Sequence, residues 1–211
     1  MELSGLERFQ RFEFTLPFYR TRIDIFEGRV KRFVNGKNSV TLKQLRYAFK
    51  EDSKWSDLSV EDSILCKLIS SEYFQDEKAP EEINIHSLIL YGLMLCPGDM
   101  QLKARVFYDI LQDSLQETIS ANDKDFKETL NKMIEVATKM TYKFEAEYDG
   151  SLAMSDDKIN EDLLETLSEG FLDEIFGANA KLPRKEHMNL VATKQNWIFS
   201  AKQIREKVDK A

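Results

Sequence analysis

The chain is poor in the residues that interrupt or cross-link a fold, with 2 Cys, 4 Pro and 8 Gly among 211 residues. So little Gly and Pro excludes collagen-like and low-complexity chains and argues against an all-β fold with many turns. Cys66 and Cys96 each lie in an apolar, helix-like stretch. We therefore expect two reduced, buried thiols and no disulfide, as is usual in the cytosol.

Long apolar runs are also missing. The longest, from Leu88 to Cys96, is interrupted by Gly92 and is far shorter than a membrane-spanning helix. The first residues, MELSGLERFQRFEF, lack the apolar core of a secretory signal. We expect no membrane span and a cytoplasmic location.

Signatures of catalysis and of zinc binding are absent as well. The sequence has no glycine-rich phosphate loop with a GKS or GKT ending, no HExxH and no recognisable nucleophile motif. Its two histidines, His86 and His187, lie far apart in the chain and next to no cysteine. We expect a protein that is not an enzyme, although a helical enzyme subunit without signature residues stays open as a third reading.

Charge is plentiful but unevenly distributed. Charged residues make up 32% of the chain and the formal net charge is −7, yet the first fifty residues and the last thirty lean basic while residues 145–174 are strongly acidic. Solvated faces explain these runs, and separate partners for the two signs are the alternative. Nucleic-acid binding is not expected, because the phenylalanines near the basic residues, Phe26 and Phe33, share the apolar stripe of a helix.

Apolar residues, 42% of the chain, recur mostly at helical spacing and predict an all-α fold. Residues 1–17 are the exception, since Phe12, Phe14 and Leu16 alternate with polar residues and indicate an extended arm or short strand. The remaining pattern predicts a first lobe over 18–96, a second lobe over 97–194 with a loop-like insertion near 146–160, and a tail helix over 195–211. Pro97-Gly98 marks the boundary between the lobes.

Several helix ends can be assigned from capping residues. Thr41 with Gln44 is a capping box, and Ser59 with Asp62 resembles another. Gly177 is placed to end a helix, and Pro183 suits the first turn of the next. The result is eight helices in four pairs, followed by the tail helix.

Each helix pair is joined by a loop that contains one lone aliphatic residue. These residues are Val40, Ile83, Ile119 and Leu182. The segments NSVTLKQLRYAF, EINIHSLILYGL and TISANDKDFKETL, and more loosely AKLPRKEHMNLV, share this order of loop, aliphatic residue and helix. The pattern over roughly residues 18–194 resembles the EF-hand superfamily, in the calmodulin-like arrangement of two paired hands per lobe. The resemblance implies antiparallel bridges that pair Val40 with Ile83 and Ile119 with Leu182.

The loops depart from the family's calcium-binding pattern. A functional loop supplies oxygen ligands from its first, third, fifth and twelfth residues and has Gly at the sixth. Here the first loop begins with Phe33 and has Lys37 at the fifth position, and the fourth loop is short, although Glu186 follows at its final position. The second and third loops offer mixed sets: Asp76, Lys78, Pro80, Glu81 and Ser87, and Gln112, Ser114, Gln116, Glu117 and Asp123. We therefore expect no cofactor and no calcium, and a sensor that uses one non-standard loop, the second or the fourth, is the alternative.

The resemblance implies a non-catalytic interaction subunit that holds an amphipathic helix of a protein partner within a larger hetero-complex. Relatives of this kind serve as light chains, as regulatory subunits of phosphatases and channels, or as docking subunits in ciliary and cytoskeletal complexes. The candidate contact residues come from the arm, the two lobes and the tail helix, which could also fill the second groove itself. They are Phe9, Phe12, Phe14, Leu93, Met94, Met133, Met140, Met188, Trp197, Ile198 and Ile204.

Overall fold

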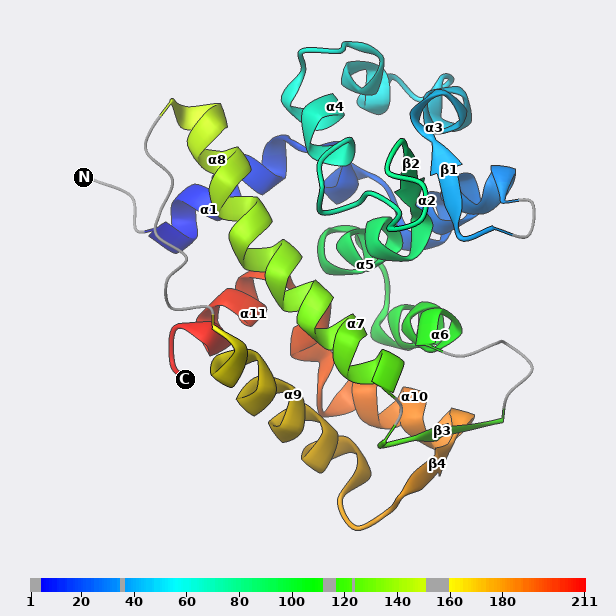
Figure 1. The fold of residues 1–211 in the computed structure, drawn as a ribbon, viewed down its shortest axis with the longest axis vertical. Coiled ribbons are helices and arrows are strands. Elements are labelled where there is room, and N and C mark those ends of the chain that lie inside the picture. The colour runs from blue at the N-terminus through cyan, green and yellow to red at the C-terminus, as the bar shows by residue number, and fades with distance from the viewer. Residues whose placement is uncertain (1–4, 35–36, 112–116, 123, 151–159) are drawn as a thin grey trace. The chain divides into compact units, whose positions relative to one another are not determined.

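The computed structural model describes residues 5–34, 37–111, 117–122, 124–150 and 160–211, and it is mostly helical (Figure 1). Strands in these residues are limited to four segments of three residues, which form two small antiparallel sheets. The predicted all-α class is confirmed at this level. No helix among the described residues is long and apolar enough to cross a membrane.

The chain divides into two compact units, each described here by itself. Unit 1 comprises Met1–Pro97 and Met140–Met154, and unit 2 comprises Gly98–Lys139 and Ser155–Ala211. The first division lies between Pro97 and Gly98, where the sequence places the lobe boundary. The second was not anticipated, because residues 140–154 were expected in the second lobe.

Unit 1 contains two helix–loop–helix segments and two flanking helices (Figure 1). Its elements are α1 Gly5–Thr15, a 3-10 helix Pro17–Arg20, α2 Ile23–Val30, a 3-10 helix Lys31–Phe33, β1 Ser39–Thr41, α3 Leu42–Phe49, a 3-10 helix Ser53–Ser59, α4 Ile64–Ile69, β2 Glu82–Asn84, α5 Ile85–Leu95 and α8 Thr141–Asp149. The core is aromatic. The Trp55 ring stacks on Phe49 at 4.1 Å between centroids, and its indole N–H donates to the Thr21 hydroxyl at 2.9 Å.

Unit 2 repeats the helix–loop–helix arrangement. Its elements are α6 Met100–Leu111, β3 Thr118–Ser120, α7 Lys124–Glu135, a π-helical turn Val136–Met140 whose last residue belongs to unit 1, α9 Glu161–Phe176, β4 Lys181–Pro183, α10 Arg184–Thr193, a 3-10 helix Asn196–Phe199 and α11 Ala201–Val208. Its core is built around the buried ring of Phe126, which meets Phe107, Phe171 and Phe176 at centroid distances of about 6 Å.

Local sequence explains most of the helix boundaries. The Thr41 hydroxyl accepts from the Gln44 N–H while the Gln44 side chain accepts from the Thr41 N–H, so the predicted capping box is confirmed. Gly177 ends α9 at φ 53°, as predicted. The cap predicted at Ser59 is wrong, because α4 begins later and its cap is Ser63, whose hydroxyl accepts from the Cys66 N–H.

The prediction of an extended arm over residues 1–17 is wrong. Residues 5–15 form α1, in which Phe9 and Phe12 share one buried face, and Leu16 is buried just after the helix ends. Phe14 is 57% exposed, so its part in the apparent alternation was coincidental. Helix formation follows from the surface that α8 provides, since α1 packs along α8 and Phe9 stacks on Tyr142 at 4.5 Å (Figure 1).

The insertion expected near 146–160 is also corrected. Residues 141–149 form α8, which ends at Gly150 with φ 66°. Residues 151–159 lie outside the described part of the chain. Helix α8 packs against α1 and α4, and the Glu145 carboxylate accepts two hydrogen bonds of 3.1 Å from Arg8, which explains why this segment belongs to unit 1.

Candidate functional site

The loops between paired helices meet two by two. Val40 pairs with Ile83 in the sheet of β1 and β2, and Ile119 pairs with Leu182 in the sheet of β3 and β4. All four side chains are buried. The predicted pairings are thus confirmed residue by residue. Each sheet ties two helix–loop–helix segments into one unit.

In the first loop, the side chain at the final position is already engaged. The Gln44 side-chain oxygen accepts from both the N–H and the hydroxyl of Thr41, so it is directed toward the start of α3. Asn35 lies outside the described residues. The remaining early positions carry Phe33 and Lys37, which offer no oxygen ligand.

In the second loop, the first carboxylate stabilises its own turn. One oxygen of Asp76 accepts from the N–H groups of Lys78 at 2.9 Å and Ala79 at 3.2 Å. The Asn84 side chain accepts from the Ser87 N–H and caps α5. The Asp76 oxygen at the first position of this loop therefore holds the local backbone.

The third and fourth loops bring little more within the described residues. Gln112, Ser114, Gln116 and Asp123 lie outside them, and Glu117 is exposed. The fourth loop is closed by a hydrogen bond from the Asn179 N–H to the Phe176 carbonyl, and Glu186 is exposed beyond it. In the described ranges, no three His, Cys, Asp or Glu residues come together in a way that could hold a metal ion.

Most of the candidate partner-binding residues are core residues in this structure. Nine of the eleven are buried: Phe9, Phe12, Leu93, Met94, Met133, Met140, Trp197, Ile198 and Ile204. Met188 is half-buried, and Phe14 is exposed beside Tyr19, with 4.6 Å between the ring centroids. Their role in partner binding stays a prediction, and in the described structure their own units already cover most of them.

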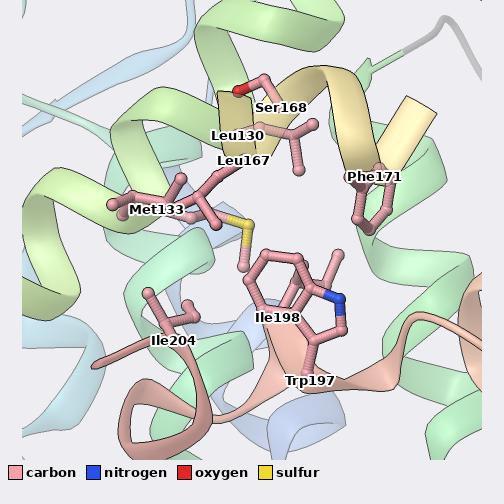
Figure 2. Close-up of a pocket in the computed structure, with 9 residues that line it drawn as sticks. Leu130, Met133, Leu167, Ser168, Phe171, Trp197, Ile198 and Ile204 are labelled. Atoms are coloured by element: carbon pink, nitrogen blue, oxygen red, sulfur yellow. The ribbon is translucent and has the colours of Figure 1, made fainter. Parts of the chain in front are cut away.

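The structure does bring four of these candidates together in unit 2. Met133, Trp197, Ile198 and Ile204 line a narrow apolar crevice that has no room for a water molecule, and Figure 2 shows Met133 and Trp197 pointing into it. The other lining residues come from α7 and α9: Leu130, Ile134, Leu167, Ser168 and Phe171. The segment after α10 therefore occupies the groove between α7 and α9, as the sequence had allowed. It does so as a 3-10 turn followed by α11, not as the single tail helix expected over 195–211.

A buried arginine secures this tail. Arg205 on α11 is fully buried, and its guanidinium donates to the Ala137 carbonyl at 2.9 Å. Sequence reading missed it by treating arginine as solvated. The signal was present, because Ala201, Ile204, Arg205 and Val208 form a helical stripe.

A buried histidine is the second group that sequence reading missed. His187 on α10 is fully buried, its ring lies 5.6 Å from both Tyr108 and Phe126, and neither ring nitrogen has a hydrogen-bond partner in the described structure. Burial lowers the pKa of His187 to about 4. The sequence contained a signal that this position is buried, since His187 follows Leu182 by five residues just as the apolar Leu45 follows Val40.

The surroundings of both histidines affect their protonation. His86 is half-buried and its pKa is lowered by burial and then by the nearby charge of Lys31. Both histidines are thus neutral near pH 7.

Comparison with protein-family models, curated proteins and solved structures finds no match to this chain.

Proposed function

We propose that the chain is an EF-hand-like protein whose paired loops have lost calcium binding, and that it serves as a non-catalytic interaction subunit of a larger assembly. The observation that carries the proposal is the pairing of Val40 with Ile83 and of Ile119 with Leu182. In EF-hand proteins an equivalent pairing joins two helix–loop–helix hands. Four such segments, paired in chain order, support the calmodulin-like arrangement.

The state of the loops supports independence from calcium. Gln44 and Asp76 hydrogen-bond to backbone groups of their own loops. Calcium requires six to eight oxygens at once, so side chains that hold a turn in this way make poor ligands. The units are therefore assembled by packing and by the two sheets, without an ion.

The proposed partner is a protein that presents an amphipathic helix within a cytoplasmic hetero-complex, and a cytoskeletal or ciliary complex is the candidate. Of the candidate contact residues, Phe14 is the one that a partner reaches without displacing core, because it is 57% exposed. Tyr19 beside it extends the aromatic surface. We propose this face of unit 1 as the first point of contact.

The test is affinity purification of the full chain from its own cells, with calcium or with a chelator. We expect one partner in fixed stoichiometry, recovered equally in both conditions. Recovery that depends on calcium would instead favour a sensor with one non-standard loop, and the absence of any stoichiometric partner would contradict the proposal.

A matched pair of variants locates the contact. Phe14→Ser should reduce recovery of the partner at least tenfold, whereas Val60→Ser should leave it unchanged. Val60 is a suitable control, because it is 54% exposed and lies in the same unit but outside the proposed face. Equal recovery by the two variants would exclude Phe14 from the interface.

A further inference from the structure

The π-helical turn Val136–Met140 is an irregular segment that directly follows α7. A π turn accommodates one more residue than an α-helical turn, so one carbonyl near its end loses the amide that would normally donate to it. Ala137 lies in this turn and is fully buried, which leaves water unable to replace the missing donor. This carbonyl therefore needs a donor other than a helix amide.

The Thr138 hydroxyl and the Arg205 guanidinium both donate to this segment. The Thr138 hydroxyl donates to the Ile134 carbonyl at 2.6 Å, a local bond of the kind that bends helices. The Arg205 guanidinium donates to the Ala137 carbonyl at 2.9 Å, across 68 residues of sequence. The second bond depends on where the tail lies.

Arg205 is carried into place by the apolar part of the tail. Its neighbour Ile204 lines the crevice with Trp197 and Ile198, against Met133 of α7 and Phe171 of α9 (Figure 2). Burying a guanidinium is costly unless it is hydrogen-bonded, so the docked tail and the Ala137 carbonyl depend on each other. Docking of the tail and the π turn are thereby coupled.

We propose that Arg205 is a latch that holds the π turn only while the tail occupies the groove between α7 and α9. Release of the tail removes the donor from Ala137, and the turn returns to α-helical bonding, which satisfies that carbonyl from within the helix. The tail is thus a switch for the hydrogen bonding of this turn, and the inference does not depend on the proposed function.

The test measures which carbonyl each amide of the turn is bonded to, by NMR scalar couplings across hydrogen bonds in the deuterated full chain. In the wild type, amides of the turn should couple to carbonyls five residues back. In Arg205→Met, whose apolar side chain keeps the tail docked, they should couple to carbonyls four residues back. Retention of the five-residue pattern in Arg205→Met would overturn the proposal, because the turn would then form without Arg205.

Two further variants separate the latch from general loss of structure. Lys202→Met removes a partly exposed positive charge from the same helix and should keep the wild-type couplings. Ile204→Ala loosens the tail but keeps Arg205. On warming, its Trp197 indole signal and the couplings of the turn should change at the same temperature. A turn that keeps its π bonding after Trp197 becomes exposed would contradict the coupling, even if Arg205→Met failed to fold.

Discussion

Single buried polar residues set the special properties of unit 2. His187 is enclosed by the rings of Tyr108, Phe126 and Phe176, and Tyr108 lies in turn under the Arg184 guanidinium at 4.9 Å. Burial keeps the imidazole neutral. The two segments of unit 1 place the buried Leu45 and Leu88 at the equivalent position, so His187 fills a core position with a side chain that titrates.

The buried His187 predicts that the protein loses stability in mild acid. The folded pKa of about 4 is below the unfolded value of 6.5, so the folded state binds fewer protons between these pH values. Stability is complete above pH 6.5 and falls as the pH drops toward 4. The difference corresponds to roughly 3 kcal/mol. His187→Leu should remove this dependence, measured as the free energy of unfolding in urea at several pH values.

His86→Gln is the matched control. His86 is only half-buried, and the variant should flatten the same pH range by a smaller amount. Parallel pH curves for wild type and His187→Leu would show that His187 is solvated and would contradict the structure at this residue.

At the level of the element, the sequence predicted the helix pairs and their joining strands, because each depends on short-range signals. The Thr41–Gln44 box and the Gly177 end are examples. Helix α1 could not be predicted in the same way, since its helical form is favoured by α8, more than one hundred residues later. The cap of α4 was misplaced because Ser59 has Asp62 three residues later, which resembles a capping box. The actual cap is Ser63, which accepts from the N–H of Cys66 three residues later.

The close packing of α5 on α2 gives a second prediction. A methyl group added to Gly92 would lie 2.4 Å from a ring carbon of Phe26, which is itself fully buried. Gly92→Ala should therefore destabilise the protein by about 1–3 kcal/mol, because the ring has little room to move. Thermal unfolding measures the change.

Gly28→Ala provides the control on the facing helix. Gly28 is exposed in α2 with nothing within 4 Å of the added methyl group, so the variant should gain about 0.5–1 kcal/mol. A Gly92→Ala variant as stable as Gly28→Ala would mean that α2 and α5 are farther apart than described.

For the whole molecule, the sequence predicted the four helix–loop–helix segments. It predicted the division into units only in part. The break after Pro97 coincides with a turn signal, but the assignment of 140–154 to unit 1 rests on contacts such as Arg8 with Glu145, 137 residues apart. Candidate contact residues were chosen for being apolar. Apolar side chains serve core and interface equally well, so sequence could not tell the buried Trp197 from the exposed Phe14.

The central claim is that the paired loops hold together without calcium, and calorimetry of calcium added to the chelator-stripped full chain tests it most directly. We expect only heats of dilution up to about millimolar calcium, because the loop side chains support the backbone and several ligand positions lack oxygen. A saturable heat with a submillimolar dissociation constant would contradict the account.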